Sequence, residues 1–364
     1  MILENIEVKN FRCLKKVSLD FNQKLNIIVG NNGQGKTSLL EAIYLLAFTK
    51  SHKTISEREV IMTETDFTKV SGEFTRNEYK SKFSFTITKT NKKAEINNSL
   101  QKKLSEYIGN INLVMFSPED FSIVKGDPAK KRKFIDIEVG QTSPMYIYNL
   151  LLYRKILKQR NELLKKIARK EINDIKLLDI ISEQLCDVGE KIVCEREVFI
   201  QKLVKYIQSI HKDLTNKAED VNIIYKRTYK ENLLRDMKNK YEYDIVTGST
   251  SIGPHRDNFV ILLNNQDISV YGSQGQQRTA ILSIKLALID FINEKKSENP
   301  ILLLDDVFSE LDVERLNSLV KFINRDIQTF ITTTDISLID QELIKEATIY
   351  IVNEGKYKVG GGND

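Results

Sequence analysis

The sequence predicts an α/β protein in which a head with mixed sheets is interrupted by an inserted, predominantly helical arm domain. Residues 30–37 read Gly-Asn-Asn-Gly-Gln-Gly-Lys-Thr, a complete G-x-x-x-x-G-K-[ST] phosphate loop. Residues 301–306 read Ile-Leu-Leu-Leu-Asp-Asp, a hydrophobic strand that ends in acids. Between these two motifs, the apolar pattern changes from strand-like to helical over residues 115–245. We therefore expect a head built from residues 1–114 and 246–364, with residues 115–245 forming the arm.

The composition is that of a water-soluble chain with room for two or three domains, since 41% of its 364 residues are hydrophobic. No apolar stretch approaches the roughly 20 residues that a membrane span needs. The first residues, Met-Ile-Leu-Glu-Asn-Ile-Glu-Val, show no basic region followed by an apolar run, so no secretory signal is indicated. We expect a cytoplasmic protein without a membrane partner. The three cysteines have no C-x-x-C spacing and do not indicate a structural zinc site.

The phosphate loop lies in the context that its chemistry requires. Residues 24–29 form a short run rich in β-branched side chains, and residues 38–47 have the pattern of a helix. Backbone N–H groups of the loop and the helix N-terminus then bind phosphate, which a chance glycine-rich turn would not do. Lys36 should reach the β- and γ-phosphates, and the Thr37 hydroxyl should bind Mg²⁺. The predicted nucleotide contacts here are Gly30, Asn31, Asn32, Gly33, Gln34, Gly35, Lys36, Thr37 and Ser38.

The run Ile301–Leu304 has the character of a central parallel strand that is buried on both faces. Adjacent acids are costly at the end of such a strand unless they meet a cation. We therefore predict Asp305 as a Mg²⁺ ligand and Asp306 as the carboxylate that orients or activates an attacking water. The alternative for Asp306 is a helix or turn cap. Lys36, Asp305 and Asp306 are the catalytic candidates.

Residues 273–277, Ser-Gln-Gly-Gln-Gln, precede an apolar-rich helical pattern over residues 278–292, which Ser273 or Gln274 would cap. Taken alone, this is only a helix start. Together with the other motifs, it resembles the signature motif of ABC-type ATPases, whose capped helix end faces the γ-phosphate held by the opposite subunit. The resemblance implies an ABC-type P-loop ATPase head, an ATP-dependent homodimer, and nucleotide contacts from Ser273, Gly275 and Gln276.

Two departures from the ABC pattern predict slow turnover. Asp306 replaces the glutamate usual in that superfamily, and its shorter reach aligns the water less well. Thr334 or Asp335 occupies the position where many relatives carry a histidine that contacts the γ-phosphate. The run Ser309-Glu-Leu-Asp312 resembles the loop that connects the two sites of such dimers.

The insertion carries the patterns of two long helices. Leu150, Leu157 and Leu164 recur at heptad spacing, and no proline or glycine lies between Met145 and Lys170. A second apolar pattern runs from residue 178 to residue 203, with an interruption at Glu195. Joined at residues 170–174, these helices would form an antiparallel hairpin.

Positive charge is concentrated in this insertion. Residues 145–170 contain eight basic side chains and one acid, which gives +7 (8 − 1), whereas the whole chain carries +5. Residues 130–133, Lys-Lys-Arg-Lys, form a second cluster. No ladder of aromatic residues accompanies the charge, so we predict double-stranded, gapped or junction DNA held through its phosphates. A protein-binding or merely solvated surface is the alternative. The DNA-binding candidates are Lys131, Arg132, Arg154, Lys158 and Arg169.

Motifs along the whole chain resemble those of the RecF family of ABC-type ATPases, which are related to SMC heads. They are Lys9–Arg12, Gly30–Thr37, Ser51–Thr54, Phe116–Asp120, Gly253–Asp257, Ser273–Arg278 and Leu302–Asp312. The resemblance implies a slow, DNA-stimulated ATPase of recombinational and replication-gap repair that dimerises with ATP on DNA and works with RecR, RecO and RecA. It also places Arg12 near the base or ribose of the nucleotide. Where related ATPases have a Mg²⁺-contacting glutamine, this chain has Pro118-Glu119-Asp120, so whether Glu119 and Asp335 replace the usual contacts stays open.

The sequence also bears on other functional classes. A helix of about 26 residues spans roughly 39 Å, and with no Cys-x-x-Cys apex this arm disfavours a long-armed SMC-like tether. A basic helical insertion does not suit the ATP subunit of a transporter. His255-Arg-Asp257 does not mark a kinase, because no Asp-Phe-Gly follows and the phosphate loop is of the wrong type. An ATP-binding structural DNA clamp with negligible turnover and a short-armed SMC-like tether remain alternatives.

Overall fold

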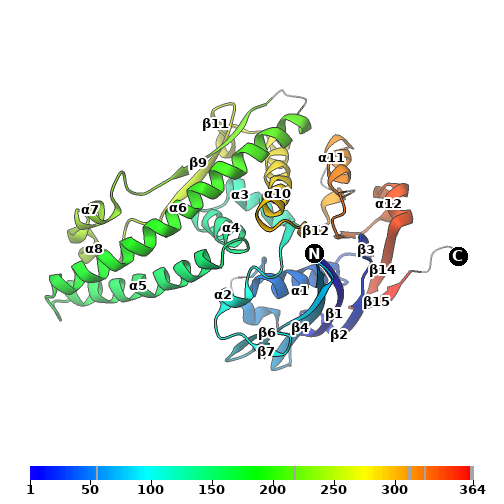
Figure 1. Ribbon diagram of the computed structural model, residues 1–364, viewed down its shortest axis with the longest axis horizontal. Helices are drawn as coiled ribbons and strands as arrows, with labels where there is room; N and C mark the ends of the chain where they lie inside the picture. Colours follow the sequence, from blue (N-terminus) through cyan, green and yellow to red (C-terminus); the bar gives the residue numbers. More distant parts are fainter. Residues whose placement is uncertain (55, 216–218, 310–312, 324, 361–364) are drawn as a thin grey trace. The chain divides into compact units, whose positions relative to one another are not determined.

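The computed structural model describes residues 1–54, 56–215, 219–309, 313–323 and 325–360. The chain forms two compact units (Figure 1). Unit 1 comprises Met1–Asp120 and Leu282–Asp364, and unit 2 comprises Phe121–Ile281. The α/β class and the mixed sheets predicted from the sequence are confirmed.

The phosphate loop belongs to a six-stranded sheet of unit 1 with the order β15-β14-β3-β13-β12-β8. Its strands are β3 (Leu25–Val29), β8 (Leu113–Phe116), β12 (Ile301–Asp305), β13 (Thr329–Thr333), β14 (Ala347–Asn353) and β15 (Lys356–Val359). All neighbours are parallel except β15, which pairs antiparallel with β14 at one edge. All five residues of β12 are buried, as its uninterrupted apolar run predicts. The carboxyl ends of β3, β13, β12 and β8 therefore lie along one edge.

A second, antiparallel sheet of unit 1 has the order β2-β1-β4-β5-β6-β7. Its strands are β1 (Ile2–Phe11), β2 (Leu14–Asp20), β4 (Phe67–Arg76), β5 (Tyr79–Thr88), β6 (Lys92–Ile96) and β7 (Ser99–Leu100). The buried side-chain amide of Gln328 joins the two sheets, because its Oε1 accepts from Leu3 N at 2.7 Å and its Nε2 donates to Leu3 O at 2.8 Å. Such pairing satisfies backbone groups that the sheets themselves leave open.

Helix α1 (Lys36–Phe48) lies between the sheets, in contact with β1, β4 and β5 of one and with β8, β12 and β13 of the other. Eleven of its residues are buried, which explains why it is apolar nearly all round. The predicted helix over residues 38–47 is therefore present, with two more residues at its start. The remaining helical segments of unit 1 are η1 (Glu57–Val60), α2 (Leu104–Tyr107), η2 (Pro118–Asp120), η3 (Val307–Ser309), α11 (Val313–Ile323), η4 (Ile336–Leu338) and α12 (Gln341–Glu346).

Unit 2 is built around the antiparallel pair α5 (Pro144–Ala168) and α6 (Ile175–Leu214), drawn in green in Figure 1. Both predicted arm helices are present. Helix α6 runs through Glu195 without a break, because that carboxylate accepts a hydrogen bond from Ser143 Oγ at 2.7 Å and so has a partner inside the arm. A three-stranded sheet of β9 (Val221–Lys226), β10 (Asn258–Leu263) and β11 (Gln266–Asp267) completes the unit with the helices α3 (Phe121–Lys125), α4 (Pro128–Gly140), α7 (Leu233–Lys238), α8 (Tyr241–Thr247) and α9 (Ile268–Tyr271).

Helix α10 (Gln274–Lys296) carries the boundary between the two units, at Ile281 and Leu282. We expected the head to resume at residue 246. By contacts, however, residues 246–281 go with unit 2, since β10 pairs along its whole length with β9 and since α4 also packs on β10. The first boundary, after Asp120, lies close to the expected residue 114.

Candidate active site

The phosphate loop leaves the carboxyl end of β3, at the sheet edge where ligands of parallel α/β sheets bind. Gly33 and Gly35 have φ of 80° and 110°, which non-glycine residues rarely adopt. Gly30 is required for a different reason, because a Cβ there would lie 2.5 Å from Val352 O. Asn31, Asn32 and Gly33 are exposed, so the tip of the loop is open to a ligand.

Lys36 is buried and turned back onto the loop. Its Nζ donates to Gly30 O at 2.7 Å and to Asn31 O at 3.3 Å. These two carbonyls hold the Lys36 ammonium at the centre of the loop. A bound phosphate group would replace them as the hydrogen-bond partner of the ammonium. The half-buried Ser38 hydroxyl lies 3.6 Å from Cys13 Sγ.

The turn between β14 and β15 fastens the loop from the side. Gly355 N donates to Gln34 O at 2.9 Å, and the Tyr357 hydroxyl donates to Gly35 O at 2.8 Å. Burial raises the pKa of Tyr357, so its hydroxyl remains a donor at every physiological pH. Residues 355 and 357 thus support the glycine-rich loop through two of its carbonyl oxygens and occupy none of its N–H groups.

Asp305 ends β12 beside the start of α1. Its Oδ1 accepts from Thr37 Oγ1 at 2.8 Å and from Thr332 Oγ1 at 2.9 Å. Burial raises the pKa of Asp305, while the hydrogen bond from Thr37 and the charge of Lys53 oppose that rise. The two predicted Mg²⁺ ligands, Thr37 and Asp305, are therefore neighbours although 268 residues separate them.

Lys53 is a cation of this site to which we assigned no role from the sequence. Its Nζ lies 3.8 Å from Asp305 Oδ2 and 3.7 Å from Glu119 Oε1. Glu119 is therefore part of the same cluster, on the short helix η2 that follows β8. Behind it, the Asp120 carboxylate forms a buried ion pair with Lys285 Nζ at 2.8 Å and accepts from Ser117 N, which fixes the turn.

The donor set suits Mg²⁺. A hydroxyl and a carboxylate oxygen are hard ligands, and Mg²⁺ usually takes one or two of these from the protein and the rest from phosphates and water. Across the residues that the structure describes, no group of three or more His, Cys, Asp or Glu side chains could hold a metal by itself. The arrangement at Thr37 and Asp305 therefore fits a metal that is shared with a phosphate ligand.

Asp306 adopts a left-handed backbone with φ 52°, and its N donates to Thr332 Oγ1 at 2.9 Å. A non-glycine residue held in this region is strained, and such strain is common at functional sites. The same Thr332 hydroxyl thus positions both adjacent acids. Asp335, by contrast, caps η4, because its Oδ1 accepts from Ser337 N at 2.8 Å. Residues 310–312 of the predicted connecting loop lie outside the described residues.

Arg12 is anchored to α1. Its Nε and one terminal nitrogen donate to the two carboxylate oxygens of Glu41, at 3.1 and 2.8 Å, and its other terminal nitrogen donates to Glu59 O. Although burial opposes it, the hydrogen bonds from Arg12 and Ser51 lower the pKa of Glu41. The guanidinium is one-quarter exposed, and its predicted contact with a base or ribose stays a prediction.

The signature residues of unit 2 form a capping box. Gln276 N donates to Ser273 Oγ at 3.2 Å, and Ser273 N donates to Gln276 Oε1 at 2.8 Å. Ser273 and Gln274 are exposed, and Gly275 is half-buried. The buried Gln277 side chain holds the preceding turn by donating to Ile268 O and Gly272 O. The start of α10 is thus a rigid, exposed helix N-terminus, the kind of structure that binds anions.

The predicted DNA-binding cations differ in exposure. Lys158 is 80% exposed and Arg169 is 72% exposed. Arg154 is half exposed and lies 3.3 Å from Asp136, and Arg132 donates to Asp257 O at 2.9 Å. Lys131 does not fit the prediction, because it is buried at 7% exposure over the ring of Phe259.

A further cation of the basic helix is also internal. Arg160, counted above among the eight basic residues, is fully buried and forms an ion pair with Asp244 at 2.8 Å. It therefore contributes nothing to a surface field. The charge that α5 presents to solvent is smaller than the sequence count indicates.

The run Gly253–Asp257, to which the sequence assigned no chemistry, is the centre of a buried polar network in unit 2. His255 Nδ1 lies 2.7 Å from the Tyr153 hydroxyl, and His255 Nε2 lies 3.0 Å from Thr250 O. The Asp257 carboxylate accepts from the Tyr225 hydroxyl and from both Thr228 N and Thr228 Oγ1. This run therefore joins α5 to β9 and is structural.

Comparisons with known proteins agree with this arrangement. The family model described as RecF/RecN/SMC N terminal domain matches residues 2–357. The DNA replication and repair protein RecF of Listeria monocytogenes serotype 4b (strain CLIP80459) is 43% identical over 98% of this chain and 100% of its own length. The chain belongs to the RecF family. The RecF protein of Ligilactobacillus salivarius (strain UCC118) is 41% identical over 98% of this chain and 97% of its own length.

RecF structures also match this chain from end to end. The recombination mediator protein RecF-ATP of the RecFOR pathway has a TM-score of 0.91 and 34% identity, and the match covers 99% of this chain and 98% of that one. An Smc head bound to the C-winged helix domain of ScpA has a TM-score of 0.56 at 15% identity, which shows a shared fold alone. In the described part of this RecF-family chain, no helix is both long enough and apolar enough to cross a membrane.

The sequence indicated the RecF-family motifs but not the residues that support them. Thr332 and Lys53 hold the carboxylates, and Glu41 holds Arg12. The available signal for Thr332 was the run of threonines that ends its strand, since buried hydroxyls at a strand end need polar partners. For Lys53, the only signal was a basic residue in a motif of the RecF family.

Proposed function

We propose that this chain is an ATP-dependent DNA-binding protein of recombinational and replication-gap repair, in which ATP binding drives homodimerisation on DNA and slow hydrolysis resets it. The relatives named as DNA replication and repair proteins support the process, and the RecF-ATP structure supports the nucleotide. The observation that carries the proposal is the convergence of the phosphate loop with Asp305, through the Thr37–Asp305 hydrogen bond at 2.8 Å.

In the nucleotide step, the loop N–H groups and the N-terminus of α1 bind the phosphates, and Lys36 exchanges its two carbonyl partners for the β- and γ-phosphates. Thr37 and Asp305 would hold Mg²⁺, which would supply charge neutralisation at the phosphates. Asp305 must be ionised for this, so its raised pKa opposes metal binding at low pH. When no metal is bound, the ammonium group of Lys53 balances the negative charge of Asp305.

Asp306 is the residue that we assign to the attacking water. Its carboxylate is one methylene shorter than that of the glutamate usual in ABC-type ATPases. Where many relatives have histidine, this chain has Thr334 or Asp335, and Asp335 is engaged in capping η4. Both features predict a slow turnover, stimulated when DNA brings two heads together. An ATP-binding clamp without turnover differs from the proposed ATPase only in the rate of ATP hydrolysis.

Dimerisation would use the exposed start of α10. Ser273, Gly275 and Gln276 form a rigid helix N-terminus that would receive the γ-phosphate held by a second copy. DNA would bind on unit 2 through phosphate contacts of Lys158, Arg169 and Arg154. We also infer cooperation with RecR and RecO, because the matched RecF structure is assigned to the RecFOR pathway. Cooperation with RecA and a cytoplasmic location are inferred from the resemblance to the RecF family of DNA replication and repair proteins.

The test is the mass of the chain in solution by light scattering, for the wild type and for Ser273→Arg, with Mg²⁺ and either ATP or ADP. A gapped duplex is then added to each sample. We expect a dimer for the wild type with ATP alone, a larger dimer fraction with the duplex, and a monomer for Ser273→Arg throughout. ATP binding by the variant, followed with a fluorescent analogue, is the control and should be unchanged.

Two results would contradict the proposal. If the wild type stays monomeric with ATP and DNA, the proposed ATP-dependent dimer does not form. If the Ser273→Arg variant dimerises normally, the signature residues do not lie in the dimer interface. If the dimer forms but no ATP hydrolysis can be measured with or without DNA, the chain is an ATP-binding clamp.

A further inference from the structure

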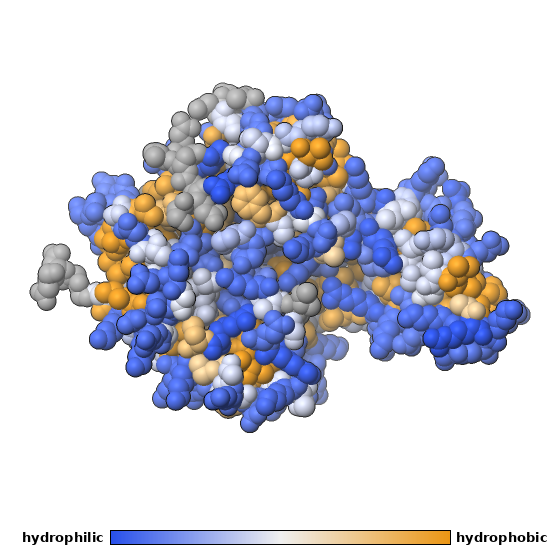
Figure 2. Space-filling model, turned by 180° about the vertical axis from the view of Figure 1, so that it is seen from behind, coloured by the Kyte–Doolittle hydropathy of each residue, from blue (hydrophilic) through white to orange (hydrophobic). Residues whose placement is uncertain are grey.

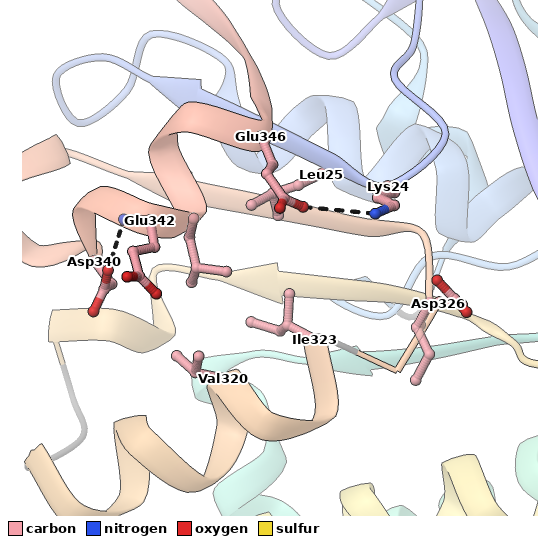
Figure 3. A pocket seen from close by; sticks show the side chains of 10 residues that line it. Lys24, Leu25, Val320, Ile323, Asp326, Asp340, Glu342 and Glu346 are labelled. Carbon is pink, nitrogen blue, oxygen red and sulfur yellow. Dashed lines mark hydrogen bonds and ion pairs between the residues drawn. The ribbon is translucent and has the colours of Figure 1, made fainter.

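Unit 1 contains a second cavity-forming region, at the sheet edge opposite to the phosphate loop. A cavity of about 280 Å³ lies between α11, α12 and the amino-terminal ends of β3 and β13 (Figure 3). Leu25 is the first residue of β3, whereas the phosphate loop follows its last residue, Val29. A ligand here would therefore not compete with a nucleotide.

We name this region the acidic groove, because an apolar floor is surrounded by carboxylates. The floor consists of the buried side chains of Leu25, Ile323, Ile327 and Leu343, with the half-buried Val320. The rim consists of the exposed Asp326, Asp340, Glu342 and Glu346, with Lys24 as its one cation. Lys24 Nζ lies 3.7 Å from Glu346 Oε2, as the dashed line in Figure 3 marks. The rim thus carries −3 (1 − 4), in a chain whose total is +5.

The chemistry of the groove excludes two simpler ligands. Among the described residues, no group of three or more His, Cys, Asp or Glu side chains could hold a metal ion, so the rim carboxylates do not form a metal site. The volume is also below the roughly 300–1,000 Å³ of cofactor and drug-sized sites. A cavity of this size with an apolar floor suits one or two anchoring side chains of a larger partner.

Neighbouring surface supports a protein partner. Leu338, two residues before Asp340, is 44% exposed. On the face shown in Figure 2, hydrophilic residues predominate and apolar ones form separate groups. An apolar floor inside a predominantly acidic rim is the pattern of an interface with a desolvated centre and a polar edge that selects by charge.

We propose that the acidic groove docks an amphipathic segment of a partner protein, with aliphatic side chains on the floor and lysine or arginine side chains against the rim. Helix-in-groove binding of this kind needs anchors on one face and complementary charges beside them. The inference goes beyond the nucleotide switch and does not depend on it. It places a protein contact on unit 1, separate from the DNA-binding cations proposed on unit 2.

The experiment measures binding of three fluorescent peptides to the full chain by anisotropy. The first is a designed leucine–lysine amphipathic helix, the second replaces its leucines with serine, and the third replaces its lysines with glutamate. The groove variant is Asp326→Asn with Glu342→Gln and Glu346→Gln, which keeps the size of each side chain. The matched control neutralises three exposed carboxylates elsewhere in unit 1, as Asp20→Asn with Glu64→Gln and Glu78→Gln.

We expect only the leucine–lysine peptide to bind, with at least about a tenfold loss of affinity in the groove variant and no loss in the control. Hydrogen exchange should show protection by the peptide within residues 313–323 and 325–346. Equal binding of the serine peptide, or competition by spermine, would overturn the proposal by reducing the groove to a site for polyvalent cations. Equal loss in both variants, or protection elsewhere, would also overturn it. Binding of a fluorescent ATP analogue should be the same in all variants, which separates this inference from the proposed function.

Discussion

The Asp305 carboxylate must be charged in a place that disfavours charge. Burial raises its pKa, and hydrogen bonds from Thr37 and Thr332 together with Lys53 only oppose that rise. By the sign of linkage, an acid with a raised pKa destabilises the fold as pH rises and the group ionises. A divalent cation reverses this cost, because it binds only the ionised form. A bound Mg²⁺ would therefore stabilise the ionised form of Asp305.

Replacing Asp305 with asparagine should remove most of the effect of Mg²⁺ on nucleotide affinity. The asparagine keeps the shape and can still accept from Thr37, but it brings no charge to the metal. In titrations with a fluorescent ATP analogue, we expect the wild type to gain affinity with Mg²⁺ over EDTA. We expect the ratio of affinity in Mg²⁺ to affinity in EDTA to be at least about tenfold smaller in the variant than in the wild type. Affinity in EDTA is the control and should be similar in both. A variant that keeps the full Mg²⁺ gain would show that Asp305 is not a ligand.

His255 is a neutral histidine at physiological pH. Thr250 O can only accept a hydrogen bond, so His255 Nε2 carries the proton and Nδ1 accepts from the Tyr153 hydroxyl. Burial lowers the pKa of His255 to about 4, from an ordinary 6.5. Between these two values the unfolded chain binds a proton that the folded chain does not. Stability from this residue is therefore complete above pH 6.5 and is lost as pH falls toward 4.

The wild type should lose stability on acidification through this window, by up to about 3 kcal/mol from His255. In a His255→Gln variant, this part of the pH dependence should be absent, although the variant is less stable at neutral pH. Urea unfolding at several pH values measures both. Since burial also lowers the pKa of His52 to about 4, the difference between wild type and variant is the informative quantity. Parallel curves for the two proteins would contradict the assignment.

At the scale of elements, buried polar contacts join the helices of unit 2. The Arg160 side chain of α5 donates to Ser182 on α6 at 2.9 Å, to Asp244 on α8 at 2.8 Å, and to Thr250 at 2.7 Å. Beside it, Leu163, Leu164 and Leu178 form an apolar cluster. The arginine thus fixes the register between helices that apolar packing alone would let slide.

Arg160→Met should destabilise the protein by about 3–5 kcal/mol, because Asp244 would lose its cationic partner and keep only the hydrogen bond from Ser251 N. The matched control is Lys158→Met, at a position on the same helix that is 80% exposed, where we expect a change within about 0.5 kcal/mol. Urea unfolding monitored by circular dichroism gives both values. Equal, small effects would mean that Asp244 finds another partner or is protonated.

Arg160 also shows what cannot be predicted from the sequence. The helical patterns of α5 and α6 were predicted, because periodicity is a local property of the chain. Whether one basic residue of α5 faces solvent or Asp244 depends on contacts across 84 positions, which no local pattern records. The same holds for Lys131, which lies over Phe259, and for Lys53, which lies beside Asp305. The phosphate loop was readable because its chemistry fixes both residue types and their spacing.

At the scale of the whole molecule, the two proposed binding surfaces carry charge of opposite sign. The acidic groove lies on unit 1, and the exposed cations of α5 and the α5–α6 turn lie on unit 2. A total of only +5 therefore hides local fields of opposite sign. Since each phosphate contact releases counterions, the salt dependence of DNA binding counts the cations that take part.

Lys158→Glu combined with Arg169→Glu should weaken binding of a gapped duplex and reduce the slope of log affinity against log salt by about 2, one unit for each lost phosphate contact. The control is Lys80→Glu with Lys102→Glu, two exposed lysines of unit 1, which changes the total charge by the same amount. If DNA responds only to total charge, both variants lose affinity equally. If unit 2 holds the duplex, the control keeps the slope of the wild type. An unchanged slope in the Lys158 and Arg169 variant would move the DNA surface away from α5 and from the turn that follows it.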